Sequence, residues 1–232
     1  MKSRYAALTA STLLFALVTT GAAAMETQQP ILKMLFTLIV TWVVIGGGLL
    51  YLFRDRIKRF SSGLPGSWRT KFVLFAIILA LVEEAITTTI TNMAPAFGAL
   101  HGTAYITAST NYLDVILFHS VIIMVPMFIA WAYLLSKYDF SPFEVFMLYG
   151  LTGVAGEAVA FGPGTLGLFH IWILIYGIMV YVPAYCVPYR ENLKRVRIYH
   201  YPLAIILPLL FTIPVWMVVG VLLQHPPIHF SF

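Results

Sequence analysis

Residues 72–90, FVLFAIILALVEEAITTTI, form an almost wholly apolar stretch that is long enough to cross a membrane as a helix. Two adjacent carboxylates, Glu83 and Glu84, interrupt it. A carboxylate in the middle of a membrane-spanning helix costs about 2.5–3.5 kcal/mol on insertion scales, so it normally has a partner or a function. Other polar side chains that reach the same depth are therefore the candidates for a functional site.

The composition of the whole chain indicates a polytopic membrane protein. Of its 232 residues, 60% are hydrophobic and 10% are charged, and the mean hydropathy is +0.89. The net charge of +5 comes from basic residues beside apolar segments, which indicates orientation in a membrane and not binding to nucleic acid. Cys186 is the only cysteine, which excludes an intramolecular disulfide and a cysteine-based metal cluster.

The N-terminus has the pattern of a secretory signal peptide. Lys2 and Arg4 precede an apolar stretch, residues 6–20, which ends in a run of small residues at 21–24. We expect cleavage after Ala24, which gives a signal peptide over 1–24 and a single transmembrane domain over 25–232. The alternative is that the segment stays in the protein as a first span.

Hydropathy predicts an all-α bundle of six transmembrane helices after the signal peptide, or seven if it is uncleaved. The predicted spans are residues 31–53, 72–92, 113–135, 142–162, 166–188 and 201–223. Among the connections between the predicted spans, lysine and arginine occur in alternate ones, and the connections 93–112 and 163–165 have none. The positive-inside rule then places both mature termini outside a cell membrane. The long outer loop 93–112 is a candidate surface for other membrane-protein subunits.

Four polar residues from four predicted helices reach the outer third of the membrane. At 1.5 Å per residue, Glu84 lies roughly 12 Å and His119 roughly 9 Å below the outer surface. Glu157 and His170 lie within about a turn and a half of the outer ends of their spans, and Asp114 is near the same rim. The remaining histidines are in predicted loops or tails and are expected to be solvated: His101, His200, His225 and His229.

Two chemistries suit this set of residues. In a hydrolase, a buried carboxylate and a histidine activate water, and a second histidine stabilises the oxyanion; the candidates are Glu83, Glu84, His119 and His170. In a metal site, carboxylates and histidines suit Zn, Mn, Fe or Cu better than Mg or Ca; the candidates are Glu84, His119, Glu157 and His170. No local metal motif such as HExxH is present.

Glycines on the predicted span 142–162 indicate close helix packing. Gly150 and Gly153 lie on the same helical face as Glu157. Small residues in a membrane helix let a neighbouring backbone approach closely. We therefore expect another helix to pack against this face.

The order of the polar residues resembles that of the glutamic intramembrane proteases of the CAAX-processing and bacteriocin-immunity superfamily. Those enzymes have a Glu-Glu pair in one helix, a histidine in the next and another histidine two helices later. The matching segments here are VEEA at 82–85, LFHS at 117–120 and LFHI at 168–171. The resemblance covers about residues 72–223 and implies that Glu83 activates water, with His119 as its partner and His170 as the oxyanion donor. The family's arginine after the glutamate pair is replaced here by Thr88.

Three functions remain open from the sequence. The first is hydrolysis of a membrane-embedded peptide or similar amide at the outer face. The second is binding of a transition metal ion. The third is a structural or assembly role in a larger membrane complex, in which the polar groups only join helices and the loop 93–112 meets a partner.

Overall fold

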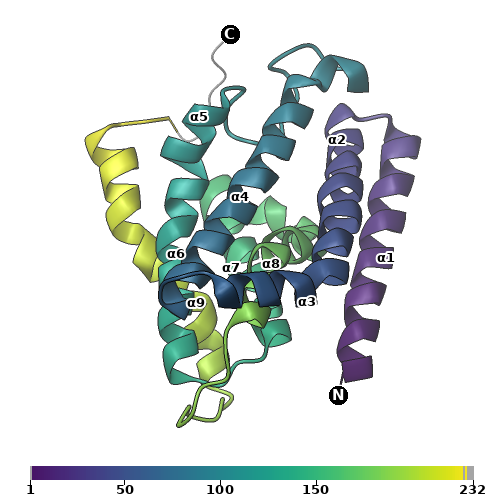
Figure 1. Ribbon diagram of the computed structural model, residues 1–232. Coiled ribbons are helices and arrows are strands. Elements are labelled where there is room, and N and C mark those ends of the chain that lie inside the picture. The colour runs from purple at the N-terminus through teal and green to yellow at the C-terminus, as the bar shows by residue number, and fades with distance from the viewer. Residues whose placement is uncertain (1, 227, 229–232) are drawn as a thin grey trace.

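The computed structural model describes residues 2–226 and 228, and every named element over them is a helix (Figure 1). Six helical segments are long and apolar enough to cross a membrane, and a bent pair of helices would make a seventh span. The prediction of an all-α architecture is thereby confirmed, and the apolar helices suggest a multi-pass membrane protein. The elements are α1 Lys2–Thr27, α2 Pro30–Leu38, η1 Ile39–Gly47, α3 Gly48–Gly63, α4 Trp68–Asn92, η2 Ala94–Phe97, α5 Tyr112–Asp114, η3 Val115–His119, α6 Val121–Lys137, α7 Pro142–Phe161, η4 Pro163–Leu168, α8 Phe169–Cys186, α9 His200–Trp216 and η5 Met217–Leu222.

Local sequence signals set the starts of the long helices. Ser141 precedes α7 and forms a reciprocal cap with Glu144: its hydroxyl accepts from the Glu144 amide at 3.3 Å, and its own amide donates to the Glu144 carboxylate at 2.8 Å. Pro142, which needs no hydrogen bond from its nitrogen, occupies the first helical position. Ser67 caps α4 without this reciprocal bond, its hydroxyl oxygen accepting from the Thr70 amide at 3.2 Å.

The predicted span 113–135 is broken in the structure. Tyr112–His119 and Val121–Lys137 meet at an angle of 46°. The break is at Ser120, whose amide donates to the carbonyl of Val115, five residues earlier, at 3.0 Å. This wider π-type turn ends the first segment and redirects the chain.

Glycines line the contact between helices α7 and α8 and let the two helices approach closely. A Cβ atom on Gly150 would lie 2.7 Å from the carbonyl oxygen of Ile173, and one on Gly177 would lie 2.6 Å from the ring of Phe146. Gly153 lies directly against the ring of Tyr176. The prediction that this glycine face admits a neighbouring helix is confirmed.

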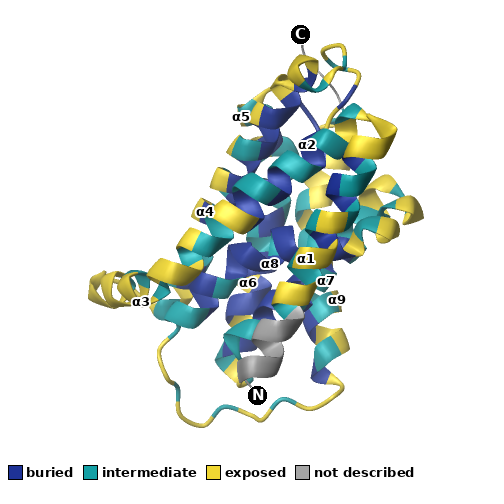
Figure 2. Cartoon of the chain, turned by 90° about the vertical axis from the view of Figure 1, so that its right-hand side faces the viewer, coloured by how far each residue is buried: buried dark blue, intermediate teal, exposed yellow. Residues whose placement is uncertain are grey.

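The two ends of the bundle differ in charge. The basic end carries the connections after α3, α6 and α8. Helix α3 also lies at this end and projects sideways from the bundle (Figure 2), and it contains Arg54, Arg56, Lys58 and Arg59. The opposite end, here called the tail end, carries the loop 93–111 and the segment after η5 (Figure 1). The start of α1 also lies at the basic end (Figure 1).

Helix α1, the predicted signal peptide, packs along α2 and against α8 (Figure 1). It buries Ala16 and Thr20, and a Cβ atom on its Gly21 would lie 3.1 Å from the ring of Phe36 in α2. The Thr19 hydroxyl lies 3.4 Å from Nε2 of His170 in α8. Cleavage after Ala24 stays a prediction, but this packing favours the alternative in which the segment remains as a span.

We therefore expect α1 to be present in the folded protein, since its removal would uncover His170 and the apolar face of α2. The intact mass of protein purified from membranes should include the residues before Met25. A mass that corresponds to a chain beginning at Met25 would contradict the expectation.

Candidate metal centre

The bent span positions the first two residues of the site. Asn111 starts α5, because its side-chain oxygen accepts from the amides of Leu113 at 3.0 Å and Asp114 at 3.4 Å. Asp114 ends α5, and His119 follows it five residues later at the end of the π-type turn η3. Residues five apart lie one above the other in such a turn, because its hydrogen bonds run from i to i+5. Both side chains therefore face the same side of the span.

The third residue comes from the other end of the chain. After η5 the segment turns back, with the His225 amide donating to the carbonyl of Val219 at 3.1 Å. The His225 ring stacks on Phe118, with 4.6 Å between the ring centroids. This places His225 beside His119, which lies 106 positions earlier in the chain.

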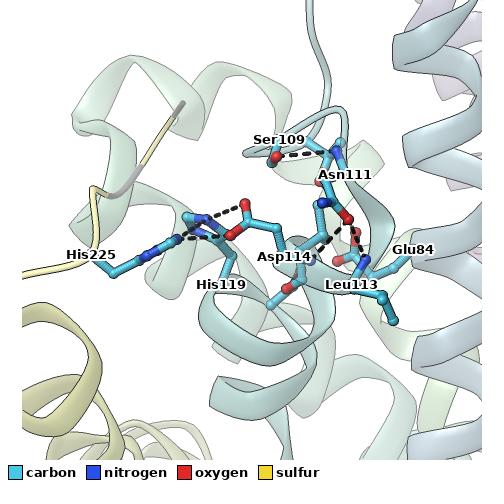
Figure 3. A network of polar contacts seen from close by, with 10 residues as sticks. Glu84, Ser109, Asn111, Leu113, Asp114, His119 and His225 are labelled. Carbon is cyan, nitrogen blue, oxygen red and sulfur yellow. Dashed lines mark hydrogen bonds and ion pairs between the residues drawn. The ribbon is translucent and has the colours of Figure 1, made fainter. Parts of the chain in front are cut away.

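Three potential ligand atoms converge at this point (Figure 3). His225 Nε2 lies 3.0 Å from Asp114 Oδ1 and 3.2 Å from His119 Nε2, and His119 Nε2 lies 3.3 Å from Asp114 Oδ2. The side chains of His119, Asp114 and His225 are only 8%, 13% and 20% exposed. The three groups are thus held together largely out of solvent at the tail end.

These separations suit a tetrahedral metal ion. With metal–ligand bonds of about 2.0–2.1 Å, tetrahedral geometry puts neighbouring ligand atoms about 3.3 Å apart. Among the described residues, no other group brings three or more ligand atoms of histidine, cysteine or carboxylate side chains within 4.8 Å of one another. Two imidazoles and one carboxylate leave a fourth position open, as in catalytic rather than structural zinc sites.

Glu84 lies near this group but has other hydrogen-bond partners. Its carboxylate accepts from the hydroxyls of Thr87 at 3.0 Å and Thr107 at 3.4 Å, and it also interacts with Ser120, the neighbour of His119. In Figure 3 it points toward the Asn111 side of the bent span, while His225 lies on the other side.

The loop 93–111 covers Glu84 from the tail end. Thr107 belongs to this loop, whose path is fixed by two further bonds to α4: Ile106 N to Thr91 Oγ1 at 3.2 Å, and Asn92 Nδ2 to Thr110 O at 2.9 Å. The loop is therefore packed onto the bundle over the glutamate pair, and part of it is buried, including Ser109.

The buried Glu83 and Glu84 form a cluster of carboxyl groups with the half-buried Glu157. Glu83 interacts electrostatically with both other glutamates. Glu157, on α7, accepts a hydrogen bond from the hydroxyl of Tyr176 on α8. Glutamates of two different helices, α4 and α7, therefore lie in one region of the bundle.

His170 lies in a different place from these carboxylates. It is buried, its Nε2 faces Thr19, and its ring contacts those of Phe15 and Phe169 at centroid distances of 4.9 and 5.4 Å. Its surroundings are thus α1 and the start of α8.

The residues predicted to share one site therefore occupy three neighbourhoods. The structure groups Glu83 and Glu84 with Glu157, groups His119 with Asp114 and His225, and places His170 against α1. Of the four predicted metal ligands, His119 is the one that belongs to the converging group. The physical reason is rotation about the helix axis: the four residues have similar depth, but their side chains leave their helices in different directions.

Two histidines expected to be solvated are not. His225 is part of the metal group, and His200 is 5% exposed, with its Nδ1 accepting from the Arg197 amide at 2.8 Å. His229 lies outside the described residues. The sequence signal for His225 was its position just after the last span, on the same side of the membrane as Asp114 and His119.

Comparisons with protein-family models, with curated proteins and with solved structures each found no match for this chain. Its function is therefore inferred from the geometry of the site.

Proposed function

We propose that this multi-pass membrane protein binds a transition metal ion through Asp114, His119 and His225. The observation that carries the proposal is the convergence of three ligand atoms from two distant segments within 4.8 Å, on side chains that are mostly buried. The three groups already contact one another, and a divalent ion placed between them would bind all three ligand atoms at once.

The donor set favours zinc or another first-row transition metal. Imidazole nitrogen suits Zn, Cu, Fe and Ni, whereas Mg and Ca prefer six or more oxygen ligands. With an open fourth position, such an ion would supply Lewis-acid chemistry and an activated water. Asp114, His119 and His225 would hold it at the membrane surface, where a small or membrane-embedded substrate could reach it.

The orientation that we propose places the metal group on the extracytoplasmic side. The basic end carries α3, the start of α4 and the connection after α8, which are rich in lysine and arginine and which the positive-inside rule assigns to the cytoplasm. The tail end, with the metal group, then faces outward. If α1 is retained, its Lys2 and Arg4 also fall on the cytoplasmic side, which agrees with the same rule.

The intramembrane-protease interpretation stays a prediction. The glutamate pair is buried as that mechanism requires, but His170, the expected oxyanion donor, lies against Thr19 and Phe15. A role as a subunit of a larger complex also stays a prediction. Both are less directly supported than metal binding by the contacts of the described residues.

Elemental analysis and calorimetry test the proposal. After treatment with a chelator, the purified full chain should take up about one zinc ion per molecule. His119→Gln should lower the affinity strongly, because it removes one of three ligands, whereas His170→Gln should leave it unchanged as a matched buried histidine outside the group. Absence of zinc binding by the wild-type protein, or equal loss in both variants, would reject the metal site.

A further inference from the structure

A surface groove lies between α4 and α6 at the basic end of the bundle, far along both helices from the metal group. It has a volume of about 410 Å³. Arg69, Thr70 and Ser136 line one part of it, and Leu74, Ile129 and Tyr133 are among the residues that line the rest. The groove therefore has a polar part and an apolar part.

The two parts follow the direction of the helices. Arg69 and Thr70 are in the first turn of α4, and Ser136 is in the last turn of α6, so the polar part is at the helix ends. Leu74 lies five residues further into α4 and Ile129 lies seven residues back along α6, which correspond to depths of roughly 8–10 Å. The groove thus runs from the level of lipid headgroups into the level of acyl chains.

The apolar part is open to its surroundings. Leu74 is 54% exposed, Ile129 is 47% exposed and Tyr133 is 51% exposed. Within a membrane these side chains face lipid, and an acyl chain that lies along them gains contact on two helices at once.

The polar part favours a negatively charged headgroup. Arg69 provides a guanidinium that can hold a phosphate through two parallel hydrogen bonds. The ammonium of Lys137 lies 5.8 Å from the centre of the Tyr133 ring, so a second cation borders the groove. Among the described residues that line the groove, none is acidic.

A second groove of about 280 Å³ lies on the other side of α4, and its basic residue is a lysine in place of Arg69. Lys71 lines it, but its ammonium already donates to the carbonyl of Ser61 at 2.9 Å. The groove between α4 and α6 therefore has the stronger case for a charged ligand.

We propose that the groove between α4 and α6 binds an anionic phospholipid, with the phosphate at Arg69 and one acyl chain along Leu74, Ile129 and Tyr133. This inference is independent of the metal site. Basic pockets between membrane helices are a recurrent means of holding anionic lipids. Bound in this way, the lipid would join the cytoplasmic halves of α4 and α6, whose other halves flank Glu84 and His119.

Native mass spectrometry of the full chain tests the proposal. The protein is equilibrated in detergent micelles with equal amounts of dioleoyl phosphatidylglycerol and dioleoyl phosphatidylcholine, and the retained lipid is counted. Wild-type protein should retain phosphatidylglycerol preferentially. The double variant Arg69→Gln/Lys137→Gln should retain roughly 30-fold less phosphatidylglycerol, because each basic residue near an anionic lipid raises the affinity for it by a factor of about five. The matched control Arg56→Gln/Lys58→Gln, which removes the same charge from α3, should retain as much as the wild type.

A further variant and a competitor separate a lipid from a free phosphate. Leu74→Trp fills the apolar part without a change in charge, and should also reduce retention, while millimolar inorganic phosphate should not displace the lipid. Equal retention of the two lipids, equal loss in the α3 control, unchanged retention in Leu74→Trp, or displacement by phosphate would each overturn the proposal.

Discussion

Replacement of His225 by glutamine is expected to weaken zinc binding at least about 100-fold while the helical bundle stays intact. Even the loss of a group that only supports a metal ligand costs about 10–100-fold in affinity, and His225 would be a direct ligand. Its side chain lies in the segment after η5, where it stacks on Phe118 and meets the metal group, and this segment is outside the helices of the bundle, so the helical bundle should stay intact. Isothermal titration calorimetry of both proteins with zinc measures the difference.

Thermal unfolding gives a second measure of the same change. A ligand that binds the folded state stabilises it by about 2.7 kcal/mol at a concentration 100 times its dissociation constant. Zinc should therefore raise the melting temperature of the wild-type protein but not that of His225→Gln. His101→Gln, in the loop 93–111 and outside the metal group, is the control and should respond like the wild type. An equal zinc-induced shift in His225→Gln would show that the tail histidine is not a ligand.

Replacement of Gly150 by alanine is expected to destabilise the protein by about 1–3 kcal/mol, the usual cost of overpacking a close-packed interior. The added methyl group would lie 2.7 Å from the carbonyl oxygen and 2.8 Å from the Cα atom of Ile173. Both are backbone atoms, so no rotamer change can relieve the contact and α7 must move away from α8. Equilibrium unfolding in mixed micelles measures the loss.

Gly156→Ala on the same helix is the matched control. Its methyl group would meet only Leu209 Cδ2, at 3.9 Å, which is an ordinary contact. Since alanine favours helix over glycine by up to about 1 kcal/mol, this variant should be neutral or more stable. The two substitutions are chemically identical. A loss of stability in Gly150→Ala without a loss in Gly156→Ala would therefore identify helix packing as the cause, and similar changes in the free energy of unfolding of both variants would contradict this explanation.

The sequence alone determined the helical class, the approximate spans and one packing face. Long apolar runs can satisfy their backbone hydrogen bonds in a membrane as helices, which is why hydropathy located α4, α7, α8 and the continuous segment of α9 and η5 within a few residues. Gly150 and Gly153 showed where two helices approach, because small residues have few other uses at that spacing.

Only the tertiary structure decided which polar residues meet. Hydropathy gives the depth of a residue in its span but not the rotation of one helix against another, so His119 and His170 looked equivalent although one faces Asp114 and the other faces Thr19. The bend at Ser120 and the return of the tail that brings in His225 depend on contacts between segments far apart in the chain. Such contacts leave no local pattern in the sequence, and so the metal group becomes visible only when the helices are packed.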